Sequence, residues 1–166
     1  MGLFGTKKPK TAKLYLIARI SKDAHDWNEE VCSHFKAPIE IFIPHHHNPY
    51  NLEHPKIPQP VVNTDINAMQ EAHIGFALPE FGNDCSFETG WFAGKNKPLV
   101  YFVNDQLHWL RDWMIKSNLT RIVTNNSQSY KTLKSDEILR DKKVVFINNL
   151  DEINQQIHEV YREHYV

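Results

Sequence analysis

Hydrophobic residues recur along this chain in short apolar runs, separated by longer stretches with helical spacing. The runs are rich in branched and aromatic residues, which is typical of buried strands. They predict strands at 13–20, 39–43, 74–78, 99–103 and 144–147, with 121–124 as a shorter candidate that is polar at both ends. Apolar positions three and four residues apart predict helices at 25–36, 63–72, 85–95, 105–117, 127–140 and 150–165. This alternation predicts an α/β fold, a doubly wound parallel sheet of about five strands with helices on both faces.

Length and charge restrict the function classes. With 166 residues, 41% hydrophobic and 23% charged, the chain is expected to form one globular domain over 13–166, after a flexible basic tail over 1–12. A net charge of −1 argues against nonspecific binding to nucleic acid or to a membrane surface. No apolar run approaches the ~20 residues of a membrane span. Two cysteines without a paired motif suit a reducing compartment, so a cytoplasmic location is expected.

Residues 45–62 combine histidines with a high density of prolines, which predicts a long irregular segment. His45, His46 and His47 are adjacent, and adjacent residues are not expected to ligate one metal without help from elsewhere. The segment is therefore expected to cover a substrate or to be an exposed polar loop, although His45 follows a strand and could face a ligand. No GxGxxG or Walker motif is present either. We expect neither a metal nor another cofactor.

Carboxylates form the most informative constellation. Glu88 is expected in the first turn of a helix, where unpaired backbone N–H groups would keep it ionised. Asp65 is expected near the start of the preceding helix, and Asp84 on the turn before Glu88. In a doubly wound fold all three would meet at the carboxyl edge of the sheet, and such a set suits glycosidic chemistry. The plain alternative is that Asp84 is only an N-cap and Glu88 only a partner of the helix dipole. Nearby Cys85 is either a thiol activated by the helix or a small packing residue.

Four motifs resemble the nucleoside 2-deoxyribosyltransferase family. They are Asp65-Ile-Asn-Ala-Met69, Glu71-Ala-His-Ile-Gly-Phe-Ala-Leu-Pro79, Phe87-Glu88-Thr-Gly90 and Gly94-Lys-Asn-Lys-Pro98. The resemblance covers roughly residues 13–103 and includes the opening strand. It implies a flavodoxin-like, Rossmann-like fold and a reaction by double displacement. One departure is His73, which stands where members often carry an aspartate.

The resemblance also implies roles for individual residues. Glu88 would attack C1′ of the deoxyribose, and Asp65 would protonate or hold the departing base. Asp84, or Asn83 beside it, would bind the sugar 5′-hydroxyl, and Tyr15 would line the pocket. Two inversions would leave the product with its original configuration.

The same resemblance bears on substrates and assembly. Asp84 would repel a 5′-phosphate, which favours deoxynucleosides and free nucleobases as substrates, whereas Ser86 is a residue that could contact a phosphate. Family sites are completed by a neighbouring subunit, which implies a homo-oligomer with a shared active site. Met114 is the nearest counterpart of the contributed residues, and Trp109, Trp113 and Met114 are a candidate interface.

Three functions remain open from the sequence. The first is a transferase that moves 2-deoxyribose between bases in nucleotide salvage. The second is a nucleoside or nucleotide N-glycosidase that uses the same glutamate with water as the acceptor. The third is a ligand-sensing module without turnover, against which the intact set of Glu88, Asp65 and Asp84 argues.

Overall fold

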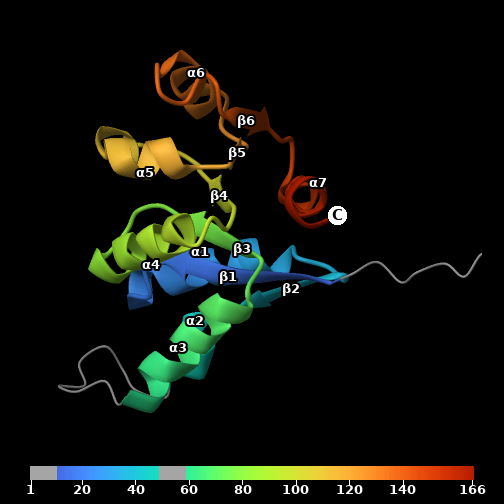
Figure 1. Ribbon diagram of the computed structural model, residues 1–166. Helices are drawn as coiled ribbons and strands as arrows, with labels where there is room; N and C mark the ends of the chain where they lie inside the picture. Colours follow the sequence, from blue (N-terminus) through green and yellow to red (C-terminus); the bar gives the residue numbers. More distant parts are fainter. Residues whose placement is uncertain (1–10, 49–58) are drawn as a thin grey trace, which may run out of the picture.

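The computed structural model describes residues 11–48 and 59–166, and most of the expected basic tail lies outside this range. Six parallel strands form one sheet in the order β2-β1-β3-β4-β5-β6 (Figure 1). The strands are β1 (Ala12–Ala18), β2 (Ile39–Phe42), β3 (Ile74–Leu78), β4 (Leu99–Phe102), β5 (Arg121–Thr124) and β6 (Lys143–Phe146). The α-helices are α1 (Lys22–Ser33), α2 (Pro44–His47), α3 (Gln59–Glu71), α4 (Asn83–Gly94), α5 (Trp113–Asn118), α6 (Ser127–Ser135) and α7 (Ile153–Tyr165).

The predicted doubly wound fold is confirmed, with six strands where about five were expected. The first five strands have the flavodoxin-like order, and β6 extends the sheet beyond β5. The strand candidate at 121–124 is confirmed, although it is polar at both ends. Arg121 is fully buried, and its guanidinium donates to the Gln156 carbonyl oxygen at 2.9 Å and to Glu163 Oε1 at 2.8 Å. Partners on α7 thus allow a charged residue inside the sheet.

The two faces of the sheet are covered by different helices. Side chains of α1 and α7 pack with Leu14, Phe76 and Phe102 in one core layer. Side chains of α3, α4 and α6 pack with Tyr15 and Tyr101 in the other. Alternate residues of each strand therefore serve opposite layers, as the pleat requires. Both faces are buried, which accounts for the continuous apolar runs in the sequence.

The segment after β2 contains more helix than its prolines indicated. Pro44 is the first residue of α2, and Pro60 lies in the first turn of α3, where a missing N–H removes no helical hydrogen bond. Helix α3 begins at Gln59, four residues before the predicted start at 63. Within it, the Thr64 hydroxyl donates to the Pro60 carbonyl oxygen at 2.9 Å. Asp65 therefore lies in the second turn of α3, deeper than expected.

Helix α4 begins at Asn83, two residues before the predicted start. Glu88 consequently lies in its second turn, not its first, which removes the expected stabilisation by free N–H groups. The helix packs closely on the sheet at Gly75. A Cβ added there would lie 2.9 Å from Leu99 and 3.0 Å from Phe92, so the absence of a side chain allows α4 to approach β3.

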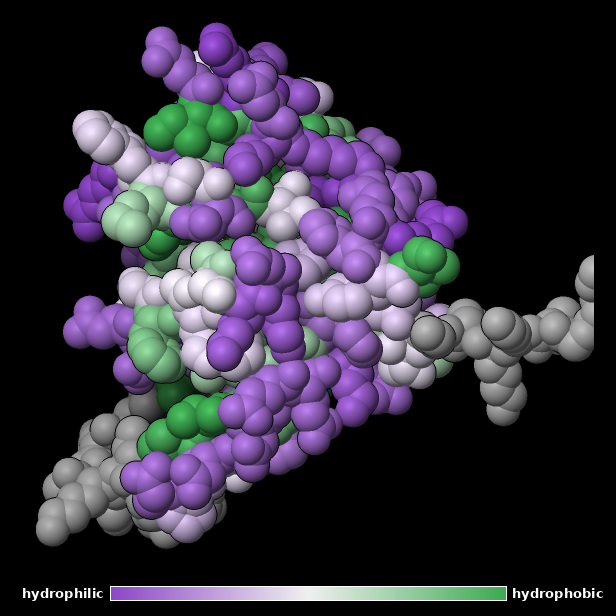
Figure 2. All heavy atoms as spheres, in the orientation of Figure 1, coloured by the Kyte–Doolittle hydropathy of each residue, from purple (hydrophilic) through white to green (hydrophobic). Residues whose placement is uncertain are grey.

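The expected amphipathic helix over 105–117 is a short 3₁₀ helix, η1 (His108–Arg111), followed by α5. Among the described residues no helix is long and apolar enough to cross a membrane. Polar side chains predominate on the face of the molecule in Figure 2.

Candidate functional site

The site begins with a contact between β1 and α4. Tyr15 is completely buried, and its side chain crosses from β1 toward α4. Its hydroxyl donates to Glu88 Oε1 at 2.7 Å. The Tyr15 ring is held by stacking on Phe42 of β2, with ring centres 5.6 Å apart, and by Phe92 of α4 at 6.1 Å. Residues 73 positions apart in the chain thus form a fixed hydroxyl–carboxylate pair.

Glu88 lies where its charge is destabilised. Burial raises its pKa to about 7, and the neighbouring charges of Asp65 and Asp84 add to this rise. The hydrogen bond from Tyr15 acts in the opposite direction and lowers the pKa. The expectation that the helix start keeps Glu88 ionised is therefore wrong, because Glu88 is in the second turn and away from bulk water.

Asp65 is the second carboxyl of the site. Burial raises its pKa to about 6. Its Oδ1 atom is buried and has no hydrogen-bond partner among the described residues. Glu88 already accepts a hydrogen bond from Tyr15, whereas Asp65 has a buried oxygen to spare. Because the pKa of Glu88 is the higher of the two, an ionised Glu88 beside a protonated Asp65 is the less populated form of the pair, and it is the form that glycosidic chemistry at this site would use.

The remaining predicted residues of α4 divide between two sides of the helix. Asp84 is exposed and lies one turn before Glu88, close enough for its charge to raise the pKa of that carboxyl. Asn83 and Ser86 are exposed on another side, where they line a cavity of about 340 Å³ together with His108 and Arg111 of η1. The structure thus brings Tyr15, Asp65, Asp84 and Glu88 together, whereas Asn83 and Ser86 line a cavity on another side of α4.

The predicted interface is only partly exposed. Met114 and Trp113 are 82% and 72% exposed at the start of α5. Trp109 is buried in the core, and its indole N–H donates to the Gln106 carbonyl oxygen at 2.9 Å. Including Trp109 in an exposed face was wrong, because the break between η1 and α5 turns it inward. No described contact joins Met114 to Glu88 of the same chain.

Two other sequence expectations concern Cys85 and His73. Burial raises the pKa of the Cys85 thiol to about 11, which supports its role as a packing residue rather than a nucleophile. His73 precedes β3 at the opposite edge of the sheet from its carboxyl ends, where its Nδ1 accepts a hydrogen bond from the Lys13 amide at 3.0 Å. The departure from the family pattern at His73 therefore concerns the scaffold and not the carboxylates.

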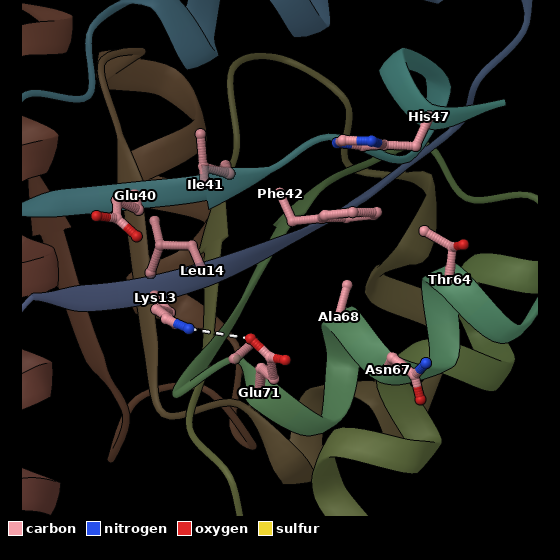
Figure 3. Close-up of a pocket in the computed structure, with 11 residues that line it drawn as sticks. Lys13, Leu14, Glu40, Ile41, Phe42, His47, Thr64, Asn67, Ala68 and Glu71 are labelled. Carbon is pink, nitrogen blue, oxygen red and sulfur yellow. Dashed lines mark hydrogen bonds and ion pairs between the residues drawn. The ribbon is translucent and has the colours of Figure 1, made fainter.

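Sequence reasoning missed Phe42, which stacks on Tyr15, and named His47 only as a part of the histidine segment. Phe42 is the register partner of Tyr15 in the sheet, and its other contact is the His47 ring, which stacks on it at 4.3 Å. Both rings line a groove of about 430 Å³ between β2 and α3, shown in Figure 3. Polar side chains of Thr64, Asn67 and Glu71 line its α3 side. Only the pairing of β2 with β1 relates Phe42 to Tyr15, and a single sequence does not give that pairing.

Comparisons with known proteins support the fold. No protein-family model matches the sequence, and no curated protein matches it. A conserved protein from Enterococcus faecalis V583 superimposes with a TM-score of 0.52 at 14% identity, over 90% of this chain and 98% of that one. The 2-deoxyribosyltransferase of Bacillus psychrosaccharolyticus also gives 0.52, at 16% identity, over 82% of this chain and all of that one. A CMP N-glycosidase from Clostridium botulinum gives 0.46 at 14% identity, too distant to support a conclusion.

The likeness to the two structures that superimpose with a TM-score of 0.52 therefore extends to the fold, at identities too low to carry over a specific activity. The fold implied by the sequence resemblance is confirmed. Chemically, the described site offers a carboxylate fixed by a tyrosine and a second carboxyl able to carry a proton near neutral pH.

Proposed function

We propose that this chain is a glycosyl-transferring enzyme that moves 2-deoxyribose from one nucleobase to another. The observation that carries the proposal is the Tyr15–Glu88 hydrogen bond, 2.7 Å long, with Asp65 close enough to raise the pKa of Glu88. A nucleophile needs a fixed position, and a leaving base needs a proton donor. These three residues supply both.

The reaction would proceed in two displacements. A Glu88 carboxylate oxygen attacks C1′ as the bond from C1′ to the base nitrogen breaks, and the electron pair leaves with the base. Asp65 gives its proton to that base, so a neutral nucleobase departs. A ring nitrogen of a second base then attacks C1′ from the same face, Glu88 leaves as a carboxylate, and Asp65 recovers the proton of the incoming base. Two inversions retain the configuration at C1′.

One incubation tests the proposal. The protein is mixed with thymidine and adenine, and the products are separated by chromatography. Formation of deoxyadenosine supports transfer. The variant Glu88→Ala should lose transfer by at least about 10³-fold, the scale expected when a covalent nucleophile is removed. Glu30→Gln is the control, since Glu30 is an exposed carboxylate on α1, which covers the opposite face of the sheet from α4. Full activity in Glu88→Ala would refute the mechanism.

A hydrolase is the second candidate, with water in place of the acceptor base. The cavity beside α4 gives a specific reason to test nucleotides, because Arg111 and His108 line it next to Asn83 and Ser86. Glu80 and Asp112 line the same cavity and offset that positive charge. We therefore favour free nucleosides. Release of deoxyribose 5-phosphate from a deoxynucleotide, with no transfer to adenine, would favour the hydrolase instead.

We further propose that the enzyme acts as a homo-oligomer in the cytoplasm. Phe87 on α4 and Trp113 and Met114 on α5 are exposed apolar side chains, which are unusual on a surface that remains in water. The two buried free thiols, Cys32 and Cys85, are consistent with a reducing compartment. A monomeric mass in light scattering would refute the oligomer.

A further inference from the structure

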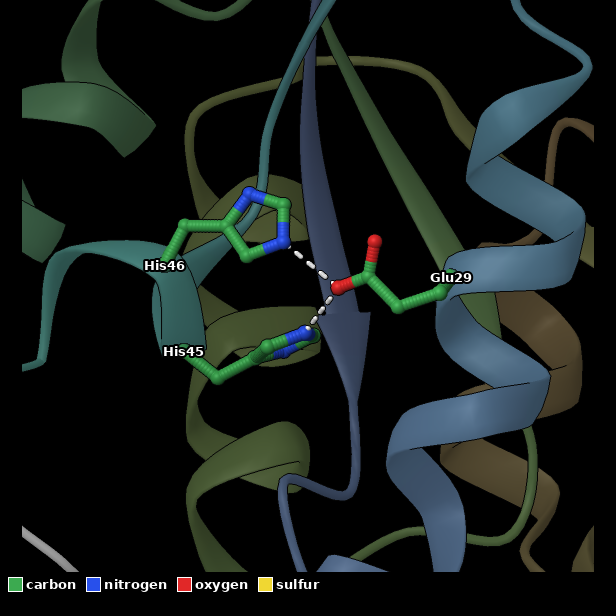
Figure 4. Close-up of side chains that lie close together, drawn as sticks. All are labelled: Glu29, His45 and His46. Atoms are coloured by element: carbon green, nitrogen blue, oxygen red, sulfur yellow. Dashed lines mark hydrogen bonds and ion pairs between the residues drawn. The ribbon is translucent and has the colours of Figure 1, made fainter.

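A cluster of two histidines and a glutamate lies outside the carboxylate site. Glu29 projects from α1, and His45 and His46 project from the neighbouring α2 (Figure 4). His45 Nε2 lies 2.6 Å from Glu29 Oε1, and His46 Nε2 lies 2.5 Å from the same oxygen. One potential ligand atom from each residue falls within 4.8 Å of the others. Two separate elements of the fold therefore place three donor atoms around one point.

The arrangement resolves the objection raised by the adjacency of the histidines. Neighbouring residues of a helix point about 100° apart. Here both imidazole rings are nevertheless directed at the same carboxylate, that of Glu29 (Figure 4). The carboxylate supplied by α1 is the third donor that the sequence did not place beside them.

The two imidazoles share one acceptor, because His45 Nε2 and His46 Nε2 both contact Glu29 Oε1. Two N–H donors that share one acceptor oxygen form weaker hydrogen bonds than two donors with separate acceptors. A cation placed among the three atoms would attract all of them at once.

From this geometry we infer that Glu29, His45 and His46 bind a divalent transition-metal ion of the zinc class. Two imidazole nitrogens and one carboxylate oxygen are typical Zn²⁺ ligands, and a solvent molecule would complete a tetrahedron. With metal–ligand bonds of about 2.0–2.2 Å, the donors would stand roughly 3.3–3.5 Å apart. The contacts must therefore open by a little under ~1 Å. The side chains of Glu29 and His46 are 47% and 48% exposed, so both can make this adjustment.

The environment of His45 fits a ligand. Its side chain is only 9% exposed and stacks on the His25 ring with centres 4.4 Å apart, which fixes its orientation. Burial lowers the pKa of His45, and Glu29 opposes this. Its Nδ1 has no hydrogen-bond partner among the described residues, which leaves Nε2 as the atom through which it makes polar contact.

The ion would join α1 to α2 across the end of the first two strands. Helix α2 also carries His47, whose ring stacks on Phe42 beside Tyr15. Binding of the metal would therefore fix the helix that borders the groove. The metal site itself does not depend on the proposed transfer of deoxyribose.

The experiment is a titration of the full-length, tag-free protein with ZnCl₂, followed by isothermal calorimetry. The wild type should bind one equivalent of Zn²⁺, and Co²⁺ should give the intense visible absorption of a four-coordinate site. MgCl₂ should not compete, because Mg²⁺ prefers oxygen ligands. Thermal unfolding should shift upward with Zn²⁺, which reports binding without an activity assay.

Glu29→Gln and His46→Gln should each weaken Zn²⁺ binding by at least ~100-fold, since even loss of an outer-shell partner costs 10–100-fold. His34→Gln is the matched control, because His34 is a partly exposed histidine that pairs with one carboxylate, Asp151, at 2.9 Å. It should bind Zn²⁺ as the wild type does. Absence of stoichiometric binding by the wild type, or unchanged affinity in both ligand variants, would overturn the proposal.

Discussion

Removing the Tyr15 hydroxyl should shift the pH optimum of the reaction upward and lower kcat/KM most on the acidic side. In the wild type, Glu88 must be ionised and Asp65 protonated, with pKa values of about 7 and about 6. A bell-shaped profile of kcat/KM with its maximum near pH 6–7 is expected, because both carboxyls are protonated below it and both are ionised above it. Tyr15→Phe removes a bond that favours the ionised form of Glu88.

The size of the effect follows from the bond. A hydrogen bond to a charged group contributes about 1.5–3 kcal/mol, and 1.36 kcal/mol corresponds to one pKa unit. Partial access of solvent to Glu88 reduces the expected pKa shift to about one pKa unit, so the pKa of Glu88 should rise from about 7 to about 8. The ionised fraction at pH 6 then falls about tenfold, whereas at pH 9 it hardly changes. The ratio of kcat/KM in the variant to that in the wild type should therefore increase about tenfold across this range.

The assay is thymidine-to-adenine transfer, followed by chromatography at each pH. Tyr101→Phe is the matched control: Tyr101 is equally buried on the same face of the sheet, but its hydroxyl lies 3.3 Å from Thr89 Oγ1, not beside a carboxylate. For Tyr101→Phe, the ratio of kcat/KM in the variant to that in the wild type should not change with pH. A flat ratio in Tyr15→Phe would refute the argument that its hydroxyl stabilises the Glu88 charge.

Four further predictions follow. Glu88→Gln should match the wild type in stability below pH 4.5 and exceed it by at most about 3 kcal/mol above pH 7, because the raised pKa makes ionised Glu88 destabilising. Urea denaturation at several pH values measures the difference, and an equal difference at every pH would contradict the prediction. Gly75→Ala should lower the free energy of unfolding by about 1–3 kcal/mol through overpacking, whereas Gly90→Ala, with nothing within 4 Å, should raise it by about 0.5–1 kcal/mol. Arg121→Met should cost about 2 kcal/mol in the same assay, since it removes the bonds from the buried guanidinium to the Gln156 carbonyl oxygen and to Glu163; no loss would show that the buried ion pair contributes nothing net. Met114→Glu should reduce the mass measured by light scattering if α5 forms the subunit contact, and an unchanged oligomer would exclude α5 from it.

The candidate site was anticipated unevenly. Glu88, Asp65 and Tyr15 were selected from motifs, and the described structure brings them together, although their catalytic roles remain proposals. The protonation of Glu88 was predicted incorrectly, because burial raises its pKa and because α4 begins two residues earlier than predicted, which moves Glu88 from the first turn to the second. Asn83 and Ser86 point to another side of the same helix, which depends on helix phase and not on proximity in sequence.

The sequence by itself determined the succession of strands and helices, because a buried parallel strand needs an unbroken apolar run and a covering helix needs a 3.6-residue period. Both are local properties of the chain. Only the tertiary structure decided which strands are neighbours, how far each side chain is removed from water and which distant residues share a partner. The stacking of Phe42 on Tyr15 and the meeting of Glu29 with His45 and His46 depend on strand order and on the distance between α1 and α2. The pKa values of the carboxyls likewise follow from burial, which is a property of the packed molecule and not of any segment.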